Sequence, residues 1–144
     1  MTFVPDGFEP PRRLEADAFV LEPLGPEHNE SDYAAWTSSM EHIHASPGWA
    51  ESTWPQAMTL DENRGDLERH ARDFAERTGF TYTVLAADDG SVIGCVYIYP
   101  VDGHDALALS WVRADRAELD GPLRDAMRAW LRDAWPFADV EYAS

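Results

Sequence analysis

Aromatic and acidic side chains in this sequence could together bind an organic amine. A stretch rich in proline and glycine carries Trp49 and Trp54, and a later apolar run carries Tyr97 and Tyr99. Aromatic faces attract cations, so aromatic walls combined with acidic groups would suit an amine with an apolar body. A second interpretation fits the same residues: the tryptophans fill the edge of a core, and the tyrosines belong to a strand packed on both faces.

Other chemistries have weaker support. Glu41, His42 and His44 invite a metal site, but positions two apart, such as His42 and His44, do not share a helix face. No second pair of ligands has a matching spacing, so we predict no metal site. Cys95 is expected to be a small core residue, because no nearby group would activate its thiol. Ser110 lacks the G-x-S-x-G turn of a hydrolase nucleophile.

The composition limits the partners. The 144 residues carry 27 acidic and 11 basic side chains, for a formal charge of −16. Because phosphate binding relies on basic side chains, this acidic protein is not expected to bind nucleic acid or an anionic membrane. No apolar run approaches the roughly 20 residues of a membrane span, and no secretory signal is visible. With a single cysteine, the sequence favours a globular cytoplasmic protein.

Local patterns predict one domain over residues 18–144, preceded by an extended arm over residues 1–17. The clearest element is a hairpin over residues 80–100, in which two β-branched and aromatic runs flank Asp89 and Gly90. Glycine supplies the positive φ that such a turn needs. Three further strands are predicted over residues 18–24, 105–112 and 137–142.

Three helices are predicted from apolar spacing and end signals. The first covers residues 29–44. The second begins with a capping box at Thr59 and Glu62 and stops at Gly79. The third opens at Gly121 with Pro122 as its first helical residue. The resulting order β-α-α-β-β-β-α-β, with a helix crossing between the last two strands, predicts an α+β fold. Its mixed, mostly antiparallel sheet would carry helices on both faces.

This order resembles the GCN5-related N-acetyltransferase (GNAT) superfamily, and the likeness covers about residues 18–142. Two short motifs carry it: V-I-G-C-V-Y-I in the second hairpin arm, and S-W-V-R-A-D-R at the end of the next strand. In that family a strand splays from its parallel neighbour, and acetyl-CoA inserts between them. The resemblance therefore implies that Ser110 and Val112 lie beside the pantetheine arm.

The resemblance further implies that the loop over residues 113–121 holds the pyrophosphate of acetyl-CoA, with Arg113, Arg116 and Gly121 in contact with it. Amides at a helix start favour an anion. The loop departs from the family pattern Q/R-x-x-G-x-G/A at four residues. Leu119 adds a Cβ atom where the pattern has its middle glycine, and Pro122 lacks an amide donor. Glu118 and Asp120 add negative charge.

The resemblance also indicates a proton acceptor. Asp105, at the mouth of the strand that matches the family's cofactor strand, is the expected base, directly or through water, with His104 as its neighbour. The alternative is a hydrophilic turn without a catalytic role. The last strand would form an uncovered sheet edge, so we expect two copies of the chain to associate as a homodimer.

The resemblance thus implies an acetyl-CoA-dependent N-acetyltransferase that acts on a small amine or amino compound. The alternative is a catalytically silent domain of the same fold that binds a small ligand or a protein. The residues of the loop separate these two interpretations.

Overall fold

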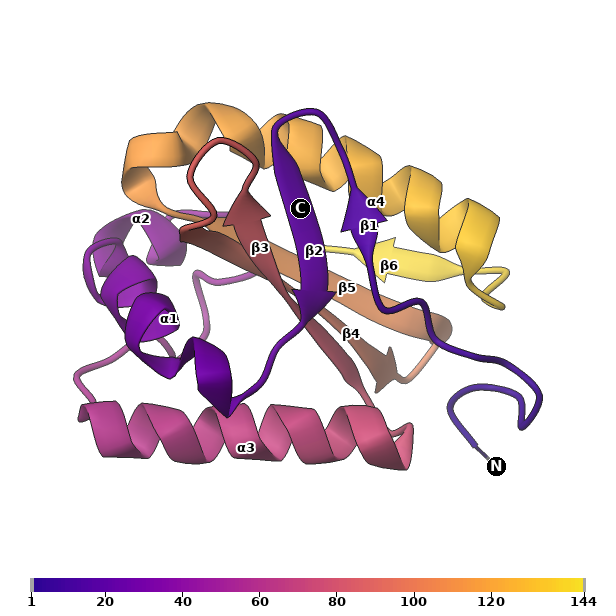
Figure 1. Ribbon diagram of the computed structural model, residues 1–144. Helices are drawn as coiled ribbons and strands as arrows, with labels where there is room; N and C mark the ends of the chain where they lie inside the picture. The colour runs from indigo at the N-terminus through magenta and orange to yellow at the C-terminus, as the bar shows by residue number, and fades with distance from the viewer. Residues whose placement is uncertain (1, 144) are drawn as a thin grey trace.

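The computed structural model describes residues 2–143 and shows one six-stranded sheet with the strand order β1-β2-β3-β4-β5-β6 (Figure 1). Neighbouring strands are antiparallel except β5 and β6, which run parallel. The predicted α+β class with a mostly antiparallel sheet is confirmed. The strands are β1 (Leu14–Glu15), β2 (Phe19–Pro23), β3 (Phe80–Ala86), β4 (Val92–Val101), β5 (His104–Val112) and β6 (Val140–Tyr142).

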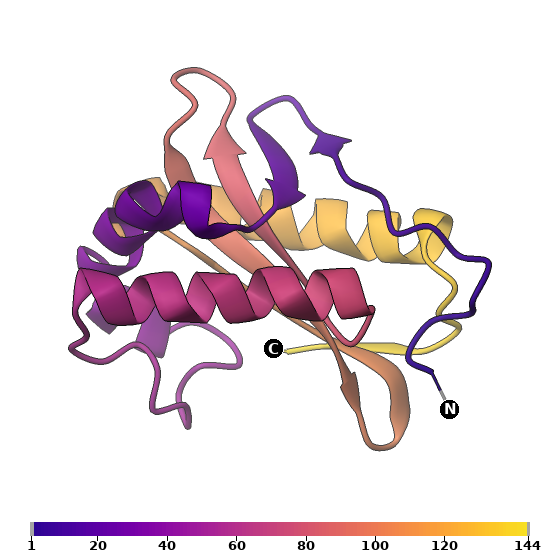
Figure 2. The ribbon, with the colours of Figure 1, turned by 60° about the horizontal axis from the view of Figure 1, so that its bottom comes forward.

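Helices cover both faces of this sheet, as predicted (Figure 2). On one face α4 (Asp120–Ala134) packs Leu123 and Met127 into the larger of two apolar cores. On the other face α1 (Asn29–Thr37), α2 (Met40–His44) and α3 (Leu60–Glu76) enclose the second core, with Trp36 and Trp111 fully buried. Two short 3-10 helices complete the chain, η1 (Pro26–His28) and η2 (Ala114–Leu119).

The predicted hairpin is formed by β3 and β4, and Gly90 in its loop has a φ of +73°. A second turn, at Asp102 and Gly103, joins β4 to β5, and Gly103 has a φ of +87°. Both glycines occupy the left-handed region, which L-residues with a side chain avoid. These two turns set the register of the three central strands.

The helix predicted over residues 29–44 is broken into α1 and α2. The break lies at Ser39, whose φ of −133° is not helical. Its hydroxyl accepts a hydrogen bond from the amide of Ala114, at 2.8 Å. Because this partner lies 75 residues away, a pattern of local spacing could not reveal the break.

The capping box of α3 is present: the Thr59 hydroxyl accepts from the Glu62 amide, and the Glu62 carboxylate accepts from the Thr59 amide. The end of α3 differs from the prediction. Arg77, with a φ of +64°, terminates the helix in the left-handed conformation. Gly79 has another role, because a Cβ there would overlap the ring of Tyr99.

Residues near the N-terminus contribute to the core. Val4 is buried, and the short strand β1 pairs with β2. The Tyr82 hydroxyl on β3 donates to the carbonyl of Pro11, at 2.6 Å.

No helix among residues 2–143 is long and apolar enough to cross a membrane.

Candidate functional site

A cavity of about 310 Å³ lies on the face of the sheet that α1 and α3 cover. The four aromatic residues singled out in the sequence, Trp49, Trp54, Tyr97 and Tyr99, all line it. They come from the loop before α3 and from β4, so the fold brings together two stretches that lie far apart in the chain. The cavity lining also includes Leu24, Asp32, Asn63, Asp66, Leu67, Arg69, His70 and Leu109.

The aromatic wall belongs to both the core and the cavity. The ring of Trp49 lies 5.4 Å from that of Trp54 and 5.5 Å from that of Tyr97, measured between centroids. Trp49 is only 6% exposed, and its indole belongs to the second core. The two interpretations of these residues, core filling and cavity lining, therefore hold together.

A buried carboxylate, Asp32 on α1, faces the same cavity. It is 4% exposed, and its one hydrogen bond among the described residues comes from Asn63 Nδ2, 3.2 Å from its Oδ2. Burial raises the pKa of Asp32 from 3.8 to about 6. A carboxylate that is desolvated and weakly bonded has a strong requirement for a cationic partner.

Asn63 on α3 holds Asp32 in place. Its amide nitrogen also donates to Asn29 Oδ1 at 2.8 Å, and its Oδ1 accepts from the Trp36 indole at 3.0 Å. Asn29 in turn donates to the carbonyl of Leu60, at 3.1 Å. This network ties α1 to the first turn of α3 and fixes the position of the carboxylate.

A second polar group lines the cavity further along α3. His70 Nδ1 lies 2.9 Å from the hydroxyl of Tyr99 and 3.1 Å from that of Thr81. The Tyr99 hydroxyl donates to Asp73 Oδ2, at 2.9 Å. Burial lowers the pKa of His70 from 6.5 to about 4.

The sequence interpretation missed Asp32, Asn63, Asp66 and His70. A signal for them exists: Asn63, Asp66 and His70 recur at spacings of three and four, so they share one face of α3. Asn63 on this face contacts α1 and His70 contacts the sheet, and at such buried contacts polar residues are unusual unless they are bonded or functional.

The structure places Asp105 and His104 at the start of β5, outside the lining of this cavity. The Asp105 carboxylate accepts from the amides of Ala138 and Asp139, at 2.7 and 3.0 Å. His104 Nδ1 lies 2.8 Å from Asp139 Oδ2. In these positions both side chains hold the turn that leads into β6.

The strand predicted to run beside the cofactor, β5, is only partly paired with its parallel neighbour β6. The paired residues are Ala106 with Val140, Leu107 with Glu141 and Ala108 with Tyr142. Beyond Ala108 this edge of β5 has no partner strand among residues 2–143. The second half of β5 therefore presents an open edge on the side away from β4.

Ser110 and Val112 lie on this unpaired part of β5. The carbonyl of Ser110 accepts from the Trp49 indole at 2.9 Å, and the Ser110 hydroxyl accepts from the Tyr142 hydroxyl at 2.6 Å. Val112 is buried. Trp49 therefore contacts the second half of β5 and the cavity at once, so the two predicted binding regions adjoin each other.

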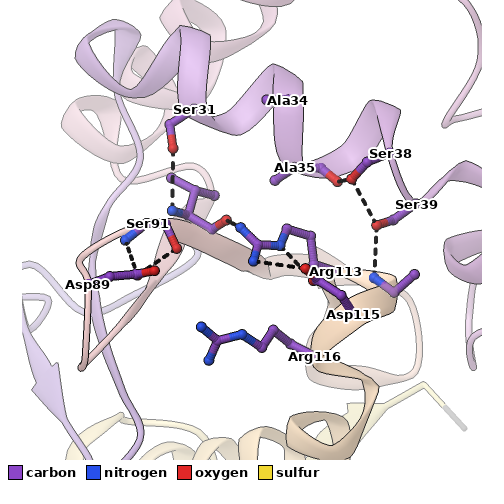
Figure 3. Close-up of polar contacts among 12 residues, drawn as sticks. Ser31, Ala34, Ala35, Ser38, Ser39, Asp89, Ser91, Arg113, Asp115 and Arg116 are labelled. Atoms are coloured by element: carbon purple, nitrogen blue, oxygen red, sulfur yellow. Dashed lines mark hydrogen bonds and ion pairs between the residues drawn. The ribbon is translucent and has the colours of Figure 1, made fainter.

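The loop predicted to hold the pyrophosphate forms the 3-10 helix η2, which runs directly into α4 (Figure 3). Arg113 makes two hydrogen bonds to the carboxylate of Asp115, at 2.8 and 3.2 Å, and one to the carbonyl of Val92. Arg116 lies 3.5 Å from the carboxylate of Asp88. Both arginines are thus already paired with acidic groups.

The start of α4 differs from the prediction. The helix begins at Asp120, so Gly121 and Pro122 are its second and third residues. Pro122 then lies in the first turn, where amides have no partner within the helix, so its missing amide costs the helix itself little. Gly121 is exposed there.

Acetyl-CoA would have to displace existing contacts both at the edge of β5 and at the loop. Beside Ser110 the edge of β5 has no partner strand, but the Trp49 indole donates to the Ser110 carbonyl there. The loop offers two arginines, but both would have to exchange a carboxylate for a phosphate, and Glu118 and Asp120 add negative charge next to them.

The sequence matches the family model "Acetyltransferase (GNAT) domain" over residues 19–143. No curated protein matches it. Among solved structures, ribosomal-protein-S5-alanine acetyltransferase from Vibrio fischeri is similar with a TM-score of 0.64 at 12% identity, covering 85% of this chain and 68% of that one.

Two further structures are similar. A GCN5-related N-acetyltransferase from Brucella melitensis has a TM-score of 0.65 at 18% identity, covering 89% of this chain and 58% of that one. The microcin C7 self-immunity acetyltransferase MccE, in complex with acetyl-CoA and AMP, has a TM-score of 0.62 at 14% identity, covering 82% of this chain and 63% of that one. At these identities the likeness shows a shared fold.

Proposed function

Because this chain belongs to the GNAT acetyltransferase family, we propose that it transfers an acetyl group from acetyl-CoA to the nitrogen of a small amine. One observation carries the proposal: an aromatic cavity that contains a buried carboxylate adjoins the open edge of β5. The acceptor would lie in the cavity and the donor along the strand. Trp49, which contacts both regions, would lie where the two meet.

The cavity suits an amine in both shape and charge. Trp49, Trp54 and Tyr97 would enclose an apolar body. The ammonium group would give Asp32 the cationic partner that it lacks, whereas the other carboxylate of the lining, Asp66, is already paired with Arg69 at 3.4 Å. The net charge of −16 would steer a cation toward the protein from a distance.

When bound, acetyl-CoA would supply the acetyl group as an activated thioester. Ser110 and Val112 would flank its extended arm. Arg113 and Arg116 would hold its phosphates after release from Asp115 and Asp88. We further propose a cytoplasmic location, with which the free, buried thiol of Cys95 is compatible.

A second candidate function is a catalytically silent domain that binds a small amine without acetyl transfer. The observation that favours it is the internal pairing of the loop: Arg113 is bonded to Asp115, and the Ala114 amide is bonded to Ser39. A site that satisfies its own donors has less to offer a ligand.

Thermal denaturation with increasing acetyl-CoA separates the two candidates. A donor that binds only the folded state raises the melting temperature with its concentration. We expect such a rise, and we expect Arg116→Glu to abolish it, because the substitution places a carboxylate beside the phosphates. Asp115→Asn should strengthen binding by about 10-fold, since it frees Arg113.

Arg132→Glu is the matched control for this experiment, because Arg132 is exposed near the end of α4 and pairs with Asp133. It should leave the acetyl-CoA shift unchanged. A melting temperature that stays constant in the unsubstituted protein and in Asp115→Asn would eliminate the acetyl-CoA proposal and leave the silent domain.

We also propose that two copies associate through β6, which is an edge strand of the sheet. Ala143 donates its amide to Ala108 on β5, so by alternation the backbone groups of Val140 and Tyr142 face away from β5. Light scattering should show a dimer, and Val140→Pro, which removes one outward amide, should shift it toward monomer. A monomer at high protein concentration would contradict this association.

A further inference from the structure

Three side chains form a hydrogen-bonded chain that leads from the cavity toward solvent. His70 and Asp73 lie on α3, one turn apart, and Tyr99 lies on β4 between them. The Tyr99 hydroxyl is 2.9 Å from His70 Nδ1 and 2.9 Å from Asp73 Oδ2. Gly79 leaves the space that the Tyr99 ring occupies. The structure thus holds the phenol between an imidazole and a carboxylate.

The direction of each hydrogen bond in this chain follows from its end group. A carboxylate has no proton to give, so the Tyr99 hydroxyl donates to Asp73. The Tyr99 oxygen must then accept from His70 Nδ1, which therefore carries the ring proton. The Thr81 hydroxyl, 3.4 Å from the Tyr99 oxygen, is a second donor to it.

His70 Nε2 is left as the basic nitrogen. No hydrogen bond among residues 2–143 involves this atom, and His70 lines the cavity in which the amine would bind. The charged neighbours of His70 on α3 are Asp66, Arg69 and Asp73; Thr81 and the two tyrosines of β4 bring no charge. Burial keeps the pKa of His70 at about 4, so the ring is neutral near pH 7.

We propose that His70 Nε2 accepts the proton that the amine loses during acetyl transfer, and that Tyr99 and Asp73 relay the resulting charge out of the cavity. This inference rests on the proposed function. Asp73 is half-buried, so a proton that reaches its carboxylate can exchange with water.

Every proton in this relay has a donor and an acceptor. The bound ammonium first releases one proton to solvent, which leaves a neutral amine. The amine nitrogen then bonds to the thioester carbonyl carbon, and the bond from that carbon to sulfur breaks. The nitrogen's proton moves to His70 Nε2, the Nδ1 proton moves to the Tyr99 oxygen, and the Tyr99 proton moves to Asp73. The thiolate that leaves takes a proton from solvent. Because each group in the relay gives up a proton as it gains one, no imidazolium needs to persist in the buried site.

His70 is the catalytic residue in this scheme, while Tyr99 and Asp73 are positioning residues that act through it. Tryptamine, a primary alkylamine with an indole ring, serves as the acceptor probe, with acetyl-CoA as donor. His70→Gln should lower kcat/KM by about 100-fold or more, the usual effect of losing a general base. Tyr99→Phe and Asp73→Asn should each lower kcat by about 10-fold and leave the affinity for tryptamine within about 3-fold.

Glu68→Gln is the matched control, because Glu68 is exposed on the same helix. It should leave kcat unchanged. Normal turnover by His70→Gln would overturn the relay. Failure of the unsubstituted protein to acetylate tryptamine that is shown to be bound would instead overturn the proposed function.

A nitrogen-15 NMR spectrum of the imidazole tests the relay without turnover. It should show His70 neutral at pH 6, with its proton on Nδ1. Tryptamine should shift the Nε2 signal, and Tyr99→Phe should populate the tautomer with the proton on Nε2, which a purely structural tyrosine would not do. A proton on Nε2 in the unsubstituted protein would contradict the assignment.

Discussion

Replacing Asp32 with asparagine is expected to stabilise the free protein while removing most of its affinity for amines. In the folded state the pKa of Asp32 is raised from 3.8 to about 6 by burial. Between about pH 4 and pH 6 the folded state therefore binds more protons than the unfolded state, and the free energy of unfolding falls as the pH rises through this window. Above it, ionised Asp32 costs about 3 kcal/mol.

Asparagine keeps the shape of the side chain and can still accept from Asn63 Nδ2 through its oxygen. We therefore expect Asp32→Asn to raise the free energy of unfolding by about 3 kcal/mol at pH 8 and by about half as much at pH 5. Affinity for tryptamine should fall at least about 30-fold, or about 2 kcal/mol, because the ammonium loses its counter-ion.

Denaturant titrations at the two pH values and calorimetric titration with tryptamine measure these effects. Asp61→Asn, at an exposed position in the first turn of α3, is the control. It should neither raise the free energy of unfolding nor lower the affinity for tryptamine. An Asp32→Asn protein that binds tryptamine as tightly as the unsubstituted one would rule out the carboxylate as the ammonium site.

Replacing Asn63 with aspartate is expected to destabilise the fold strongly at high pH. The change is nearly isosteric, but it removes the donor to Asn29 and Asp32 and sets a second carboxylate about one hydrogen-bond length from the first. Two buried acceptors lose their donor at about 1–3 kcal/mol each, and the like charges repel. We expect a loss of at least about 3 kcal/mol at pH 8.

The loss should shrink at pH 5, because the two carboxyl groups can then share a proton and restore one hydrogen bond. Denaturant titration at both pH values measures it. Gln56→Glu, which also replaces a side-chain amide with a carboxylate, lies at an exposed position of the loop before α3 and should cost little. An Asn63→Asp protein with unchanged stability at pH 8 would show that the network does not hold α1 to α3.

The order of helices and strands from β2 onward could be predicted because its signals are local, whereas the short strand β1 lies in the predicted arm and was not expected. The β-branched runs, the glycine turns and the capping box at Thr59 each act within a few residues, and the structure contains all of them. The break between α1 and α2 could not be predicted in this way, since the Ser39 hydroxyl at the break accepts a hydrogen bond from the amide of Ala114, far along the chain.

The candidate site was predictable only in its aromatic part. Large aromatic side chains on a strand and in a loop can be recognised from their residue types alone as candidates to line a cavity or fill a core. Asp32 and His70 appear in the sequence as ordinary polar positions on two helices. Their roles depend on burial and on partners such as Asn63 and Tyr99, which lie about 30 residues away in the chain.

One face of helix α3 carries four polar residues that line the cavity or form the proposed relay. Asn63, Asp66, His70 and Asp73 stand three, four and three residues apart, so one face of a single rod spans about 15 Å from the carboxylate network to the outlet of the relay. One inserted residue in the middle of this rod would turn its second half by about 100° and separate recognition of charge from transfer of the proton. Recognition of charge and transfer of the proton thus depend on the same helical spacing, so an insertion or deletion that moves one set of residues also moves the other.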